Sequence, residues 1–166
     1  METMARTVRI GALVIMAGVI LVGILGCGID SDDAEQPTGT SPVENISTNT
    51  AELEGVTWNL FSWLDEEGIA QTSYGDNISA TIEFGADGMY FAQAPVNTIR
   101  GPYTADDSGA MTIEDGAMTR ISGDEISNAA ENDFVANLQR TAGFHIANGM
   151  LRLLDSNGNP LMEFEQ

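Results

Sequence analysis

The sequence contains no lysine, one cysteine and one histidine, and each scarcity excludes a class of chemistry. Six arginines face 25 acidic residues, so the clustered positive charge that phosphate backbones require is missing. Nucleic acid is therefore not expected as a partner, and direct adsorption to anionic lipid is equally unfavourable. A lone cysteine cannot form an intramolecular disulfide, and a zinc site would need a cluster of cysteine and histidine ligands.

Catalytic signatures are missing as well. The sequence contains no G-x-S-x-G nucleophile elbow, and His145 is expected to face outward from a strand between Phe144 and Ile146. The segment Asp155–Asn159, "DSNGN", superficially resembles a calcium loop, but its glycine stands at the fourth position rather than the sixth, which favours a simple turn. We therefore expect no catalytic residue, no metal and no cofactor.

The first 27 residues have the composition of a targeting segment. Arg6 and Arg9 precede an uncharged stretch from residue 10 to residue 29, the order of a secretory signal peptide. Its end, Ile24-Leu25-Gly26-Cys27, resembles a bacterial lipobox, in which the cysteine thiol receives a diacylglyceryl group. Alternatively, the stretch is an uncleaved membrane helix or, third, a buried core helix. The first two readings agree that everything after Cys27 lies outside the cytoplasm, anchored to the membrane.

Residues 28–50 are expected to form a disordered tether, because they are polar, contain two prolines and show no apolar periodicity. Such a segment spans roughly 25–30 Å on average if it behaves as a flexible coil. Residues 51–166 are then long enough for a single folded domain. After Cys27 the chain has four arginines against 24 acidic residues, a net charge of −20. A charge of this size favours solubility and repels other anionic surfaces.

The folded part reads as mainly β structure. In residues 77–84, "NISATIEF", apolar and polar residues alternate with the period of a half-buried strand, and Gly85–Gly88 turns the chain into the next strand. Residues 111–113 and Met118 indicate two more short strands around a turn at residues 115–116. Asn148-Gly149 between two apolar runs is typical of a two-residue hairpin. A last strand is expected over residues 161–164.

One segment, residues 123–141, has helical rather than strand periodicity. Ile126, Ala130, Phe134 and Leu138 recur every four residues and predict an amphipathic helix. Ser122 and Glu125 have the spacing of a capping box, and Gly143 is the expected C-cap. A single helix between short strands predicts an α+β fold that is mainly β: an antiparallel curled sheet or small β-barrel with one amphipathic helix packed against it.

Six motifs follow one another along the folded part: Leu53-Glu54-Gly55-Val56-Thr57-Trp58-Asn59-Leu60, Ile82-x-Phe84, Asn97-Thr98-Ile99-Arg100-Gly101-Pro102-Tyr103, Thr119, Glu131-x-x-Phe134-x-x-x-Leu138 and Asn148-Gly149-x-Leu151-x-Leu153. Their order and spacing resemble the META domain, also called the HslJ-like or DUF306 domain, over residues 53–164. The family often carries one cysteine just before the asparagine and another after the threonine. Residues 95–97 and 119–122 contain no cysteine here, so no disulfide is expected.

The resemblance implies a small barrel-like domain, frequently an envelope lipoprotein and linked to stress response or antibiotic tolerance, without an established reaction. We expect the motif residues to be structural: an asparagine bonded to local backbone, a glycine that permits a turn and a tyrosine that closes over the core. These residues are Trp58, Asn97, Gly101, Tyr103, Thr119, Phe134 and Leu138.

Two functions follow as expectations. The first is a non-enzymatic, membrane-anchored accessory or binding module that holds an envelope protein, and the second is a small-ligand carrier that uses a barrel cavity. Most of the aromatic residues in "TWNLFSWL" are expected to pack in the core. Alternatively, one tryptophan, Trp58 or Trp63, is partly exposed on the solvent side of its strand and anchors the partner of the first function. An unbulged strand places Phe61 and Trp63 on one face, with Trp58, Leu60 and Leu64 on the other.

Overall fold

The computed structural model describes residues 45–73 and 78–166, which all lie in one compact unit, Thr40–Gln166. The predicted signal peptide, Cys27 and most of the predicted tether lie outside the described residues. In chain order the elements are α1 (Thr50–Leu53), β1 (Thr57–Leu64), β2 (Ala70–Thr72), β3 (Thr81–Phe84), β4 (Met89–Gln93), β5 (Thr98–Ala105), β6 (Met111–Ile113), β7 (Ala117–Met118), α3 (Glu125–Arg140), β8 (Gly143–Ala147), β9 (Met150–Leu154) and β10 (Pro160–Glu165).

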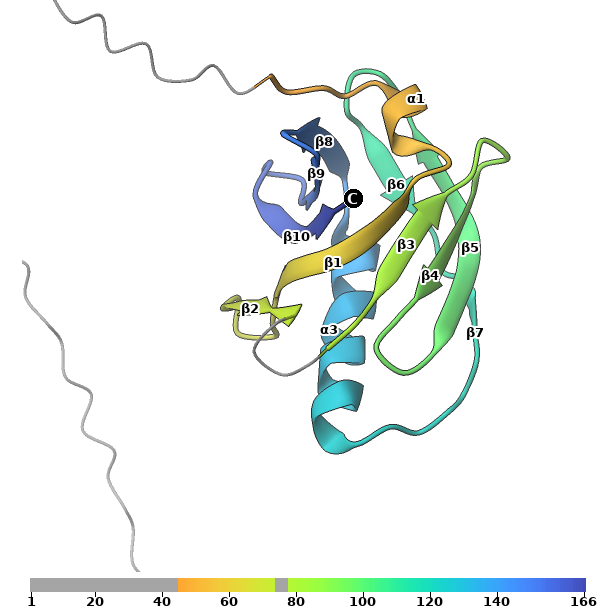
Figure 1. The fold of residues 1–166 in the computed structure, drawn as a ribbon, viewed down its shortest axis with the longest axis vertical. Helices are drawn as coiled ribbons and strands as arrows, with labels where there is room; N and C mark the ends of the chain where they lie inside the picture. The colour runs from red at the N-terminus through yellow and green to blue at the C-terminus, as the bar shows by residue number, and fades with distance from the viewer. Residues whose placement is uncertain (1–44, 74–77) are drawn as a thin grey trace, which may run out of the picture. The chain divides into compact units, whose positions relative to one another are not determined.

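The strands form one curled antiparallel sheet with α3 packed against it, as predicted (Figure 1). The order is β6-β5-β4-β3-β1-β10-β9-β8, with β2 paired to β1 and β7 paired to β5. Phe134 and Leu138 of α3 are buried, and the Phe134 ring meets the edge of Phe164 at a centroid distance of 6.4 Å. The core therefore lies between the helix and the inner face of the sheet.

The sheet does not close into a barrel, although its two end strands approach each other. Met111 N donates to Ala142 O at 3.1 Å and Phe144 N donates to Gly109 O at 2.9 Å, a single bridge between the β6 and β8 sides. Farther along β8, Ser47 N donates to Ile146 O and Ile146 N donates to Ser47 O, both at 2.7 Å. We call the contacts of Ser47 and residues 109–111 with residues 142–146 the seam.

Residues 47–50, which the sequence placed in the tether, therefore belong to the fold. The Thr48 hydroxyl donates to the carbonyl of Asp107 at 2.7 Å, and Thr50 N and Oγ1 both donate to the Asp107 carboxylate. The Asn49 side chain caps α1 by accepting from Ala51 N. The sequence of these hydroxyl-rich residues indicated disorder because the contacts that order them come from Asp107 and Ile146, which are distant in the chain.

A β-bulge in β1 changes the predicted facing of its aromatic residues. The pairing with β10 shifts register between Leu60 and Ser62, so Trp58, Leu60 and Trp63 all lie on the buried side. Trp58 is 0% and Trp63 4% exposed. The expected core packing of the tryptophans is therefore confirmed, and the alternative, a partly exposed tryptophan as a partner anchor, is wrong.

The helix is confirmed, but both of its predicted caps are displaced. Asp124, rather than Ser122, caps the N-terminus, and its carboxylate accepts from Ser127 N at 2.8 Å. Thr141 is the C-cap, while Gly143 already belongs to β8. Ile126 is 58% exposed, because it lies in the first turn and borders a surface groove.

The hairpin at Asn148-Gly149 is as predicted. Both residues have positive φ, 54° and 77°, and Ala147 pairs with Met150 across the two-residue turn. The alternation around β3 is also confirmed, since Ile78, Ala80, Ile82 and Phe84 are all buried.

Candidate functional site

Asn97, the residue before β5, is the centre of a buried hydrogen-bond network. Its Oδ1 accepts from the Thr119 hydroxyl at 2.8 Å and from Ile121 N at 2.7 Å. Its Nδ2 donates to Glu131 at 2.7 Å and to the Ile121 carbonyl at 3.1 Å. These partners lie 22 to 34 residues away, so the predicted bonding to local backbone is wrong.

Glu131 supplies the acidic half of this Asn97–Glu131 network. The side chain projects from α3, is only 7% exposed and makes no ion pair with the described arginines. Its Oε2 accepts from Asn97 N at 2.6 Å and Val96 N at 3.0 Å, so three N–H donors surround the carboxylate. Donors of this kind stabilise a buried negative charge in place of water. The network therefore fastens the helix to the β4–β5 loop and to the segment after β7.

Gly101 serves close packing, not a turn. It lies inside β5, where a Cβ atom would stand 2.8 Å from Gly116 Cα and 2.8 Å from Tyr90 Cε1. The prediction that Gly101 permits a turn is therefore wrong. Its lack of a side chain instead lets the Tyr90 ring and residues 114–116 approach β5 closely. Gly116 is equally constrained, with an added Cβ 2.6 Å from Arg100 O.

Tyr103 closes over the core, as predicted. Its ring lies edge-on to Phe84 at 4.9 Å, and its hydroxyl donates to Gly85 O at 3.0 Å. Burial, followed by the charge of Glu54, raises the pKa of Tyr103 to about 12. The hydroxyl therefore stays protonated over the physiological range and acts as a structural donor.

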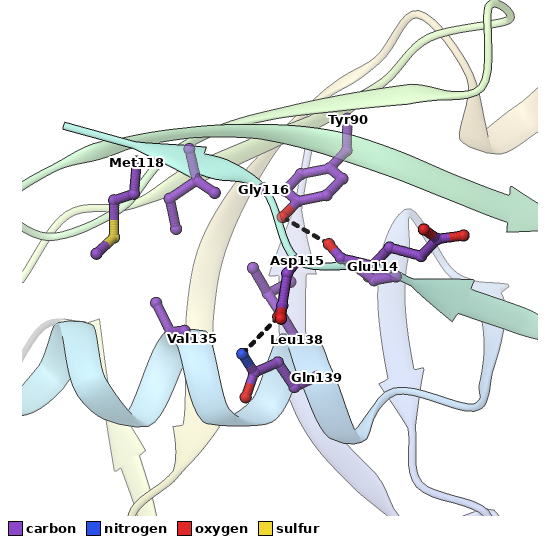
Figure 2. A pocket seen from close by; sticks show the side chains of 10 residues that line it. Tyr90, Glu114, Asp115, Gly116, Met118, Val135, Leu138 and Gln139 are labelled. Atoms are coloured by element: carbon purple, nitrogen blue, oxygen red, sulfur yellow. Dashed lines mark hydrogen bonds between the residues drawn. The ribbon is translucent and has the colours of Figure 1, made fainter.

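A pocket of about 290 Å³ lies between the sheet and α3, where Tyr90 and Gly116 pack together (Figure 2). Ile99, Ile113 and Leu138 form apolar walls. At one end of the pocket, Gln139 Nε2 of the helix donates to Asp115 Oδ1 at 2.8 Å, and the Tyr90 hydroxyl of β4 donates to the neighbouring Glu114 O at 3.2 Å. Sequence reasoning took residues 115–116 only as a turn and did not identify this pocket.

His145 belongs to a polar row on four neighbouring strands. Ser62 Oγ donates to Glu163 at 2.9 Å, Arg152 Nε donates to the other oxygen of Glu163 at 2.7 Å, and Arg152 Nη1 lies 3.4 Å from His145 Nε2. Burial raises the pKa of Glu163, but the bonds from Arg152 and Ser62 together leave it lowered. The Ser62 hydroxyl bonds the Glu163 carboxylate, which its lowered pKa makes a weak base, and Arg152 lies between this pair and the His145 imidazole. Ser62 and His145 are therefore not arranged as a nucleophile and its general base.

Residues 155–159 form the turn that their sequence indicated. The Asp155 carboxylate accepts from Asn157 N at 2.8 Å and Asn159 N at 2.9 Å, which lowers its pKa. Across the described ranges, no group of three His, Cys, Asp or Glu side chains is arranged to hold a metal ion. The same part of the chain contains no helix long and apolar enough to cross a membrane.

These features define a class: a small α+β domain in which one helix is fastened inside a curled antiparallel sheet by a buried polar network. The chain belongs to the META domain family, whose model matches residues 51–166. The resemblance argued from the sequence motifs is thereby confirmed.

Two solved structures have a similar fold. One is a protein of the DUF4847 family from Bacteroides vulgatus, 18% identical, with a TM-score of 0.52 over 70% of this chain and 96% of that one. The other is a protein from Burkholderia xenovorans, 17% identical, with a TM-score of 0.57 over 80% of this chain and 97% of that one. Among curated proteins, none matches the chain. At these identities the likeness concerns the fold alone.

Proposed function

We propose that the protein is a membrane-anchored, extracytoplasmic META-domain lipoprotein that acts as a non-enzymatic binding module of the cell envelope. The observation that carries the proposal is the order of segments. Basic residues, an apolar stretch and Leu25-Gly26-Cys27 precede the tether, and the fold begins at Ser47. The arrangement presents a small rigid domain at a short distance from the bilayer.

The distinctive residues of the family motif serve the structure of the domain. Asn97, Thr119 and Tyr103 each make hydrogen bonds that hold the fold together. Because the most distinctive motif residues serve structure, the functional surface belongs to side chains outside the motif. A role in stress response or antibiotic tolerance, which the family suggests, would then depend on the partner that this surface binds.

Membrane fractionation of cells tests the anchor. The wild-type chain should sediment with membranes, and Cys27→Ala should release the domain or leave an unprocessed precursor, because the thiol is the proposed lipid attachment point. Gly28→Ala keeps the thiol and should behave like the wild type. A Cys27→Ala chain that is processed and sediments exactly as the wild type does would contradict lipidation.

The pocket of Figure 2 favours a second function, a small-ligand carrier. Its volume of about 290 Å³ lies just below the range of roughly 300–1,000 Å³ that is typical of ligand sites. It lies between the sheet and the helix, not inside a barrel, since the sheet is open. A carrier would therefore accommodate only a small, mainly apolar molecule.

A further inference from the structure

We propose that the pocket between the sheet and α3 binds a small, neutral aromatic molecule that carries one hydrogen-bond donor, as indole does. The inference rests on the second function proposed above, a small-ligand carrier, and deepens it by assigning the chemical class of the ligand. The pocket measures about 290 Å³. The lining residues that the argument uses are Tyr90, Ile99, Asp115, Met118, Val135 and Gln139.

Two sets of hydrogen bonds fix the distance between α3 and the sheet, one at each end of the pocket. At one end, the Asn97–Glu131 network joins the helix to the segment that follows Met118. At the other end, Gln139 Nε2 donates to Asp115 Oδ1 at 2.8 Å. Glu131 and Gln139 are eight residues apart, which corresponds to about 12 Å along a helix. Because both ends are fixed, the walls cannot collapse onto the space between them, and the pocket is formed before a ligand arrives.

The walls of the pocket are apolar between these two ends. Ile99 of β5 is only 4% exposed, and Val135 of α3 is half-buried. A space lined by aliphatic side chains is poorly hydrated, so an apolar molecule enters it favourably.

Two further lining side chains favour an aromatic ring over an alkyl chain. Met118 lies at one end of the pocket and is 45% exposed, and the ring of Tyr90 lies toward the other end (Figure 2). A thioether makes favourable contacts with the edge of an aromatic ring, and a phenol ring pairs with other rings edge-to-face or offset. An aromatic molecule between Met118 and Tyr90 would gain both kinds of contact.

The polar end of the pocket offers mainly hydrogen-bond acceptors. The Tyr90 hydroxyl uses its proton on Glu114 O at 3.2 Å, which leaves the lone pairs of the hydroxyl oxygen for another donor. Asp115 Oδ1 accepts from Gln139, whereas no donor among the described residues bonds Asp115 Oδ2. A ligand that places one N–H at this end would therefore form a charge-assisted hydrogen bond with Asp115.

The charge of the pocket and its apolar walls together favour a neutral ligand. Among the described residues that line the pocket, the charged ones are Glu114 and Asp115, both acids. With a net charge of −20 after Cys27, the domain also repels anions over a long range. A full positive charge would lose its hydration against the aliphatic walls. A neutral N–H meets the acceptors without either cost.

The methionine methyl signals allow a direct test on the full chain in zwitterionic detergent, with the free ligand concentration corrected for partition into empty micelles. In protein labelled with ¹³C-methyl methionine, titration with indole should shift the Met118 signal. The signal of Met150, which does not line the pocket, should stay unchanged. Benzofuran has the shape of indole with an oxygen in place of the N–H. It should bind about tenfold more weakly, because it cannot donate to Asp115.

Two pairs of variants locate the site. Asp115→Asn should weaken indole binding and leave benzofuran binding unchanged, because the amide is a weaker acceptor of the same shape. Asp87→Asn is its matched control, since it removes the same charge from an exposed aspartate that pairs with Arg100 elsewhere, and should change neither affinity. Val135→Phe should fill the pocket and abolish both shifts. Asn132→Phe places the same ring at an exposed position of α3 that does not line the pocket, and should retain them.

Equal affinities for indole and benzofuran would overturn the inference and leave a carrier of apolar molecules without donor preference. No shift of the Met118 signal with either molecule would overturn the carrier function as well. Acetyl-tryptophan-amide that binds more tightly than indole would also overturn the inference, in favour of a site for a side chain of a protein partner. Binding in the pocket does not require a lipid on Cys27, so these outcomes leave the proposed anchor untouched.

Discussion

At the scale of single residues, a few buried polar groups fasten the elements that surround the apolar core. Asn97 is 5% exposed and uses both ends of its amide, while Glu131 is buried without a cation. Such groups stabilise a fold only when every donor and acceptor has a partner. The sequence marked Asn97 as important but assigned it local bonds, because nothing in one sequence reveals a partner 34 residues away.

Asn97→Ala should destabilise the domain by about 2–4 kcal/mol, because the change removes a donor from the Glu131 carboxylate and leaves buried groups unpaired. Urea unfolding followed by tryptophan fluorescence measures the effect. Asn132→Ala, an exposed position on the same helix, is the control and should change the free energy of unfolding by under about 0.5 kcal/mol. Similar values for both variants would show that the network contributes little.

Tyr103 gives the domain a sensitivity to alkaline pH. The folded-state pKa of about 12 lies above the ordinary value of 10.0, so between these values the unfolded chain releases a proton that the folded chain keeps. Its contribution to stability is complete below pH 10 and is lost as the pH rises through 12. Tyr103→Phe should therefore flatten the fall in unfolding free energy between pH 10 and 12, measured by urea titration at each pH. An unchanged slope would contradict the assignment.

At the scale of elements, local patterns were sufficient for some features and insufficient for others. The Asn148-Gly149 hairpin was predictable because two adjacent residues determine that turn. The bulge between Leu60 and Ser62 was not, because it arises from the pairing of β1 with β10, a hundred residues away. The N-cap of α3 is Asp124 rather than Ser122, since aspartate and serine cap the N-terminus of a helix equally well.

The seam makes the segment before α1 part of the structure. A chain that begins at Asn45 should be more stable than one that begins at Ala51, by about 2–4 kcal/mol. The shorter chain loses the hydrogen bonds of Ser47, Thr48 and Thr50 to residues 107 and 146, each worth about 0.5–1.5 kcal/mol. Chemical denaturation of the two chains, with Asp107→Ala in the longer one, measures the difference. Equal stabilities would show that the seam closes without this segment.

At the scale of the whole molecule, the sequence predicted the family and the curled sheet, but not which side chains the fold brings together on one surface. Residues 65–67 and 125–133 line a common groove only after folding brings the β1–β2 turn beside α3. The same acids read along the chain as ordinary solvated charges. Likewise, strand alternation placed Trp58 and Trp63 on opposite faces, whereas the bulge turns both toward the core.

The central claim is that this domain is displayed from a membrane by a lipid on Cys27. Mass spectrometry of the N-terminal peptide from cell-purified protein tests that claim most directly. We predict a chain that begins at Cys27 and carries a thioether-linked diacylglyceryl group. A chain that retains Met1 and has a free, unmodified thiol at Cys27 would contradict the claim.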